Sequence, residues 1–187
     1  TGQQKDCGTW TIGNELSIDP DPNRNNRYGD DRGYPEALQF FGTSTSISLE
    51  GSDEMPGFNT QFDIPPMVTI ASPEFDHGLT IGSGNTIEWE VDENNELGIG
   101  ILVSYDPGSL FNDQPELRDQ AEQHFILTED DGSYTFSEED FSGIPENVFV
   151  DIFIGRGNYE RIPSTNEEKT YGLYSYSVVK HVFKHEN

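Results

Sequence analysis

The chain has very little positive charge and almost no cysteine. Its 187 residues include 10 Lys and Arg against 35 Asp and Glu, a formal net charge of −25 at pH 7. A surface with this field repels nucleic acid and anionic membranes, so cations or neutral molecules are the expected partners. The single cysteine, Cys7, excludes an intramolecular disulfide, and its polar surroundings predict an inert thiol.

Long apolar runs are also missing. Hydrophobic residues make up 32% of the chain, and no run approaches the roughly 20 apolar residues of a membrane span. Direct membrane insertion is therefore not expected. Low hydrophobicity with high charge can indicate disorder. Here, however, the aromatic residues fall inside alternating apolar stretches that glycine and proline separate, which is typical of a folded domain.

Lysine is scarce, with only four residues beside 35 acids. An acid-rich, lysine-poor surface suits a salty medium, because ions screen the repulsion between carboxylates. The composition therefore indicates a secreted or cell-surface protein, bacterial and adapted to salt. The competing interpretation is an acidic protein built to hold calcium.

Alternation with a period of two residues dominates from residue 67 onward. In residues 86–91 it places Ile87, Trp89 and Val91 on one face of a strand and two glutamates on the other. Residues 129–132 predict a hairpin turn, and residues 155–158 predict another turn. Residues 115–123 predict a short helix. Further strands are expected over residues 44–49, 58–64, 67–70, 79–81, 98–105, 124–127, 133–136, 148–154 and 171–183.

These elements predict an all-β fold, an immunoglobulin-like β-sandwich with an irregular N-terminal extension and one short helical insertion. Residues 67–187 would form the sandwich. Residues 1–66 would form the extension, a polar loop with one or two strands packed on the sandwich.

Three short motifs carry a family resemblance. They are Val-Thr-Ile-Ala-Ser-Pro at 68–73, Gly-Asn-Thr-Ile-Glu-Trp-Glu-Val at 84–91, and Asp-Gly-Ser-Tyr-Thr-Phe at 131–136 followed by the strand at 148–154. With them, residues 67–180 resemble the bacterial immunoglobulin-like domains related to the Kre9/Knh1 cell-wall family. The resemblance implies a sandwich module of an exported or surface-anchored protein, and it transfers no binding site.

One loop has ligands suited to calcium. Oxygen-bearing side chains alternate and then recur eleven residues after the first, at Asp19, Asp21, Asn23, Asn25 and Asp30. Calcium takes six to eight such oxygens. The loop departs from the usual calcium motif, because Arg24 occupies the sixth position. A solvated loop with Asp–Arg pairs is the alternative.

Other polar clusters are expected to be solvated. The acids at 92–93, 129–131 and 138–140 all fall at predicted turns, and His181 and His185 would form a solubilising terminal patch. Aromatic residues in the polar N-terminal region, Trp10, Tyr28 and Tyr34, are candidates for stacking on sugar rings. Their alternative role is to cover one edge of the sandwich.

No nucleophile elbow and no phosphate-binding glycine loop is present. The sequence therefore favours a non-enzymatic binding or structural module, whose partner would be a neutral glycan or another surface protein. Two alternatives stay open. One is a carbohydrate-binding module. The other is a glycoside hydrolase whose carboxylate pair is defined only in space.

The charge leads to a first prediction, about salt. Screening should relieve repulsion among the carboxylates, so the melting temperature should rise between low and near-molar sodium chloride. Thermal melts followed by circular dichroism measure it. A flat or falling trend would mean that the charges are compensated locally, and it would remove the argument for a saline setting.

Overall fold

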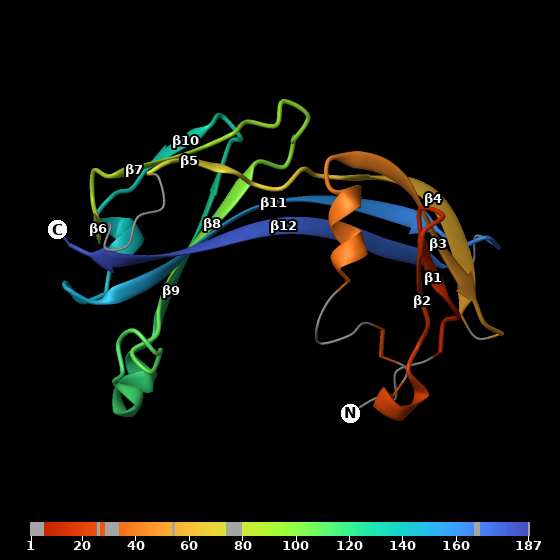
Figure 1. Ribbon diagram of the computed structural model, residues 1–187, viewed down its shortest axis with the longest axis horizontal. Coiled ribbons are helices and arrows are strands. Elements are labelled where there is room, and N and C mark those ends of the chain that lie inside the picture. Colours follow the sequence, from red (N-terminus) through yellow and green to blue (C-terminus); the bar gives the residue numbers. More distant parts are fainter. Residues whose placement is uncertain are drawn as a thin grey trace. The chain divides into compact units, whose positions relative to one another are not determined.

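The computed structural model describes residues 6–25, 27–28, 34–53, 55–73, 80–166 and 169–186 (Figure 1). The fold is an all-β sandwich. The chain divides into two compact units. Unit 1 contains Thr1–Pro66 and Asn158–Ser175, and unit 2 contains Met67–Gly157 and Tyr176–Asn187. The expected extension at 1–66 thus differs from unit 1, which also takes in residues 158–175.

Unit 2 is built from two facing sheets. The smaller has the order β10-β7-β5, with strands Ser133–Thr135, Thr86–Trp89 and Ile70–Ser72. The larger has the order β6-β12-β11-β8-β9, with strands Thr80–Ile81, Thr170–His185, Phe149–Pro163, Ile99–Tyr105 and Glu122–Thr128. Only residues up to Gly157 of β11 and from Tyr176 of β12 belong to unit 2.

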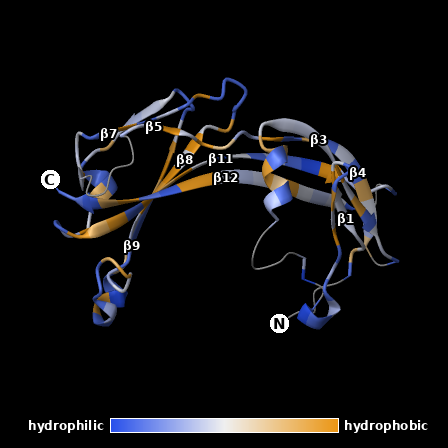
Figure 2. Ribbon diagram, viewed as in Figure 1, coloured by the Kyte–Doolittle hydropathy of each residue, from blue (hydrophilic) through white to orange (hydrophobic). Residues whose placement is uncertain are grey.

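Alternation explains why these strands enclose a core. In β8 the buried side chains Ile99, Ile101 and Val103 alternate with outward-facing positions. Val150, Ile152 and Ile154 do the same in β11, with Ile87 and Trp89 opposite them in β7. Hydrophobic residues run along β8 (Figure 2). Because branched side chains pack well on a pleated surface, this pattern buries one face of each sheet.

Unit 1 has its own core. Its sheet has the order β2-β1-β3-β4, with strands Leu16–Ile18, Trp10–Ile12, Thr43–Gly51 and Pro56–Ile64. Side chains from β3 and β4 pack with residues of the 158–175 segment. The buried members are Ile47, Leu49, Phe58, Phe62, Ile162 and Leu173.

Among the described residues, the helices are short 3₁₀ turns. They are η1 (Pro22–Arg24), η2 (Pro35–Phe40), η3 (Pro115–Gln120) and η4 (Glu139–Phe141). The helix expected over 115–123 is therefore shorter, and β9 begins at Glu122. None of the helices in the described part of the chain has the length and apolar character that a membrane crossing requires.

Several local predictions were wrong. Residues 129–132 do not join two strands of one hairpin, because β9 pairs with β8 and β10 pairs with β7. This segment instead connects the two sheets. Residues 155–158 are not a turn but continue β11, since Gly155 and Arg156 pair with Gly100 and Ile99. Val91 lies beyond β7 and is 49% exposed.

The expected terminal patch at His181 and His185 was also wrong. The His185 side chain is 1% exposed and stacks on Phe141, with 4.7 Å between ring centroids. Its Nδ1 lies 2.8 Å from the carbonyl oxygen of Pro145. His181 is half-buried, and burial lowers its pKa. The end of β12 is therefore part of the packed unit.

The second prediction concerns Trp89, which is 3% exposed in the core of unit 2. Trp89→Ala should lower the free energy of unfolding by about 3–5 kcal/mol, because it removes a large buried ring and leaves a cavity. Denaturant unfolding measures this. The matched change Val91→Ala, at an exposed position, should cost no more than about 0.5 kcal/mol. Equal costs at the two positions would contradict the assigned register of β7.

Candidate functional site

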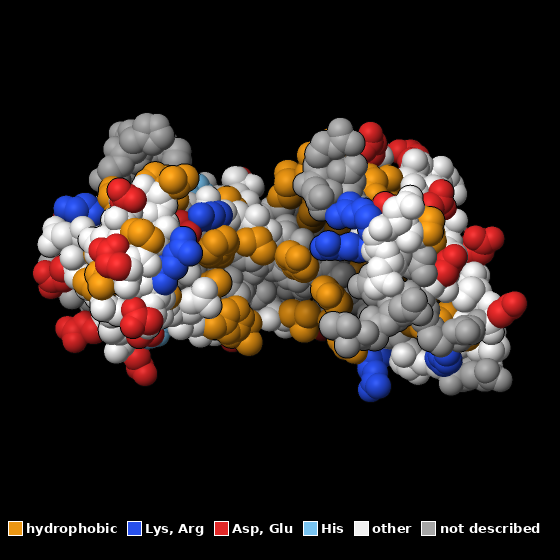
Figure 3. All heavy atoms as spheres, turned by 90° about the horizontal axis from the view of Figure 1, so that it is seen from below, with side chains coloured by type: hydrophobic (Ala, Val, Ile, Leu, Met, Phe, Trp, Pro, Cys, Tyr) orange, Lys and Arg blue, Asp and Glu red, His pale blue; other side chains and the backbone are white. Residues whose placement is uncertain are grey.

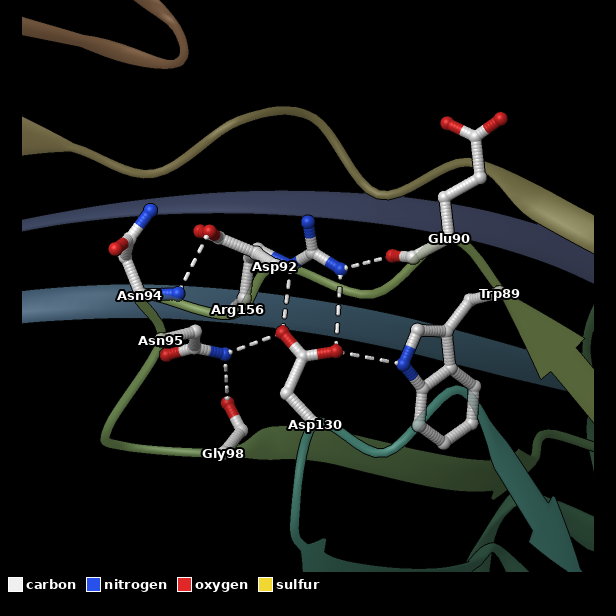
Figure 4. Close-up of polar contacts among 8 residues, drawn as sticks. All are labelled: Trp89, Glu90, Asp92, Asn94, Asn95, Gly98, Asp130 and Arg156. Carbon is white, nitrogen blue, oxygen red and sulfur yellow. Dashed lines mark hydrogen bonds and ion pairs between the residues drawn. The ribbon is translucent and has the colours of Figure 1, made fainter.

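A buried ion pair fixes one end of the two sheets of unit 2 (Figure 4). Arg156 on β11 and Asp130 on the β9–β10 connection have side chains that are each 2% exposed, and Arg156 Nε lies 3.3 Å from Asp130 Oδ2. Nε itself makes no hydrogen bond, but the terminal nitrogen Nη2 donates to Asp130 Oδ1 at 3.3 Å. The guanidinium also donates through one terminal nitrogen to the Glu90 carbonyl oxygen at 2.6 Å.

Neighbouring side chains complete the shell around Asp130. Trp89 Nε1 donates to its Oδ1 at 2.8 Å. Asn95 Nδ2 donates to its Oδ2 at 2.8 Å and to the Gly98 carbonyl oxygen at 2.7 Å. Because both carboxylate oxygens accept hydrogen bonds in a buried setting, Asp130 is a structural group. The expectation that this acidic turn is solvated was therefore wrong at Asp130.

A groove lies on the outer face of the larger sheet in unit 2, and it has a volume of about 480 Å³. Its floor is formed by outward-facing glycines of the two central strands, Gly100 on β8 and Gly155 on β11, which pair directly. Gly98 and Gly157 extend the floor. Figure 3 views the side of the molecule on which this face lies, and hydrophobic side chains gather there.

Exposed apolar side chains form the two walls of this glycine-floored groove. On β9, Phe125 is 71% exposed and Leu127 is 68% exposed. On β12, Tyr176 and Val178 face them from the other side, and Val178 is 51% exposed. Leu97, Leu102 and Phe153 complete the apolar lining. The lining contains no Asp or Glu, although the chain has 35 of them.

The strand ladder explains why a groove forms here. Residues at alternate positions of β8 and β11 point outward. Where Gly100 on β8 pairs with Gly155 on β11, both central strands lack a side chain, while the neighbouring strands β9 and β12 carry large ones. A β-carbon on Gly100 would lie 3.2 Å from the ring of Phe125. One on Gly155 would lie 2.8 Å from a methyl carbon of Val178. The walls therefore lean over the edges of a floor that has no side chains.

The residues proposed for calcium belong to the segment assigned to unit 1 and are not part of the groove lining. Asp19 accepts a hydrogen bond from Thr9 Oγ1 at 2.7 Å, and Asp21 accepts one from the Asn23 amide at 2.9 Å. Asn25 has a positive φ of 58° at the end of η1. Asp30 lies outside the described residues, so calcium binding by this loop stays a prediction. Within the described part of the chain, no group of three or more His, Cys, Asp or Glu side chains is arranged to hold a metal.

The N-terminal aromatic residues do not line the groove. The ring of Trp10 packs edge-on against Phe58, at 5.5 Å, and lies 6.5 Å from Tyr28. The Tyr28 hydroxyl donates to the Gly8 carbonyl oxygen at 2.7 Å, and burial raises its pKa. Tyr34 is half-buried where η2 begins. Trp10 and Tyr28 therefore pack together in unit 1, and stacking of Trp10, Tyr28 or Tyr34 on a sugar ring stays a prediction.

One further buried acid was misread as a solvated turn. Asp140 Oδ2 accepts hydrogen bonds from the Tyr134 hydroxyl at 2.9 Å and from the Ser137 amide and hydroxyl. Burial and this bond raise the pKa of Tyr134 to about 12. The spacing Ser-x-x-Asp, typical of a capping turn, is the signal that could have identified it.

Comparisons of the chain with protein-family models, curated proteins and solved structures give no match. Any functional assignment therefore depends on the geometry of these two units.

The third prediction tests the ion pair. Arg156→Met should cost about 3–5 kcal/mol of unfolding free energy, because it leaves the Asp130 carboxylate buried without its counter-charge. The double change Asp130→Leu with Arg156→Met should cost much less than the sum of the two single changes, since no buried charge remains. Denaturant unfolding of all three variants measures the coupling. Additive costs would contradict a direct interaction.

Proposed function

We propose that the protein is a non-enzymatic binding module of an exported or cell-surface protein, and that it binds an uncharged, largely apolar ligand in the glycine-floored groove. The observation that carries the proposal is the groove itself, an open apolar depression on the outer face of a sheet whose inner face is already packed. Ligand sites are typically concave and lined by apolar and aromatic side chains.

The glycine floor supports this function. Glycine in a strand interior weakens the strand by roughly 0.5–1 kcal/mol per residue relative to alanine, and it often marks a place where a ligand approaches the backbone closely. Two adjacent central strands carry glycine at directly paired positions, Gly100 and Gly155. The fold requires glycine at both positions, because a β-carbon on Gly155 would lie 2.9 Å from the Ser177 carbonyl oxygen and one on Gly100 would lie 3.2 Å from the Phe125 ring. The backbone of the floor is therefore left without side-chain cover.

Charge supports an uncharged ligand. The net charge of −25 would repel an anion from any part of the surface. A cation would find no carboxylate in the groove lining. Asp151, two residues before the lining residue Phe153 on β11, is neutralised by an ion pair with Lys180 at 2.8 Å, and Lys180 Nζ lies 5.4 Å from the ring centroid of Phe153. Apolar contact is therefore the interaction that this lining offers.

The lining favours hydrocarbon or aromatic groups over sugars. Sugar recognition combines an aromatic face with several polar side chains that hold hydroxyl groups. Among the lining residues only Tyr176 and Arg156 have polar side-chain groups, and the Arg156 side chain is buried against Asp130. An exported location is supported by the acid-rich, lysine-poor composition.

The fourth prediction tests the groove with the neutral dye Nile red, whose fluorescence rises in apolar surroundings. Wild-type protein should bind the dye, and Val178→Ser should weaken binding because it removes an apolar wall. Val91→Ser is the matched control, since Val91 has nearly the same exposure (49% against 51%) and does not line the groove. Fluorescence titration measures both affinities.

Equal losses in the two valine variants, or no loss in either, would contradict binding in the groove. A parallel titration with neutral oligosaccharides separates the ligand classes. If sugars bind and compete with the dye, the ligand is a glycan.

A further inference from the structure

Strand β9 forms a long edge of the larger sheet in unit 2. It is the last strand in the order, and all seven of its residues pair with β8 in one unbroken register, from Ile99 with Thr128 to Tyr105 with Glu122. Among the described residues, no backbone hydrogen bond reaches β9 from its other side. A strand in this position presents a row of open amide and carbonyl groups.

The other end strands of the described sheets are short or contacted by another segment. In unit 2, the end strands β6, β5 and β10 have only two or three residues each. In its described part, strand β6 pairs with β12 only at Lys184 and His185, and β12 carries Lys180 in the stretch before them. In unit 1, the nine-residue edge strand β4 is covered by the 158–175 segment. Three hydrogen bonds join the segment to β4. The Thr165 amide donates to the Gly57 carbonyl oxygen at 2.8 Å, and Asn158 Nδ2 donates to the Asp63 carbonyl oxygen at 2.9 Å. The Tyr171 hydroxyl donates to the Pro56 carbonyl oxygen.

Strand β9 lacks several of the devices that usually block an edge, although η4 packs beside it and Ser142, just after η4, contacts His124. Its seven residues, Glu-Gln-His-Phe-Ile-Leu-Thr, include no proline and no lysine, and its pairing contains no bulge. Its inner face is fixed, because His124 Nε2 lies 2.7 Å from the Ser142 carbonyl oxygen and Ile126 packs on the core. The edge is therefore held in an extended form that another strand could join.

Charge indicates which partner would fit. The segment before and at the start of β9 carries Glu116, Asp119 and Glu122, and the segment after it carries Glu129 and Asp131. Arg118 is the one basic residue between positions 113 and 131. A second copy of this chain would bring acidic flanks against acidic flanks in a molecule of net charge −25, which is repulsive.

We propose that the open edge of β9 binds an extended polypeptide segment of another protein by strand addition. The partner has alternating apolar side chains in its centre and Lys or Arg at both ends. Backbone hydrogen bonds to β9 would supply much of the affinity. Apolar side chains of the partner would pack beside Phe125 and Leu127 and set the register of the added strand. The acidic flanks would select a partner with basic ends. This site lies at the edge of the sheet. It shares Phe125 and Leu127 with the near wall of the glycine-floored groove, whereas the floor and the far wall, which contains Val178, belong to the groove alone.

The test uses the full chain and a short synthetic peptide with alternating Val and Thr in its centre and Lys at both ends. The peptide should bind, and it should slow amide hydrogen exchange within residues 122–128. A peptide of the same length with Glu at both ends should bind more weakly. Equal affinity for the two peptides, or protection elsewhere in the chain, would overturn the proposal.

Gln123 allows a matched pair of variants. It is exposed at the start of β9, does not line the groove, and donates a hydrogen bond only to Ser104 Oγ, at 3.2 Å. Gln123→Lys should weaken binding of the basic peptide by about threefold through like-charge repulsion, and Gln123→Glu should preserve or strengthen it. Equal affinities of the two variants would count against the charge argument.

Two controls distinguish strand addition at β9 from binding in the groove and from self-association. Val178→Ser, on the far wall of the groove, should leave peptide affinity unchanged, so that failure of the groove proposal would not affect this result. Sedimentation of the protein alone should give a monomer in low salt. A peptide-free dimer that protects residues 122–128 from exchange would replace the proposed partner with a second copy of the chain.

Discussion

The buried pair of Arg156 and Asp130 is the interaction on which unit 2 depends. Arg156 enters from the larger sheet, and its partners Asp130 and the Glu90 carbonyl lie on segments that lead into and out of the smaller sheet. A buried ion pair is weak in net stabilisation but strongly unfavourable when broken. It therefore selects one relative register of the two sheets, because any slip would leave a charge unpaired in the core. Trp89 adds to this selection by donating to the same carboxylate.

The same residue relates the core to the groove. Arg156 points inward, so its neighbours Gly155 and Gly157 necessarily point outward on β11. The ion pair thus fixes which residues of this strand face the outer surface. A register shift of one residue would place the arginine on the outer face and a glycine in the core. The location of the groove consequently depends on a charge pair that lies beneath it.

Much of the fold could be predicted from the sequence, and little of the candidate site. Alternation of Ile99, Ile101 and Val103 identifies β8 because branched side chains with a period of two residues favour a half-buried strand. The Gly-Arg-Gly sequence at 155–157 was misread as a turn, because local glycine content gives no information about a partner charge 26 residues away. Asp130 was assigned to a solvated turn for the same reason. Contacts between distant segments determine both positions, and the groove arises from glycines on strands that pair only in the folded state.

The glycines of the floor also meet a local packing requirement. Phe125 leans over Gly100 and Val178 leans over Gly155, so a β-carbon at either position would crowd its neighbour. The two walls cannot meet over the floor, because β9 and β12 are separated by β8 and β11, about 14 Å at the usual strand spacing. A volume of about 480 Å³ therefore remains open between them, and Phe125 and Val178 stay 71% and 51% exposed. Removing apolar surface from water gains about 25 cal/mol for each Å². The geometry of the sheet thus leaves apolar surface uncovered in the groove, and this is the surface that the proposed ligand would cover.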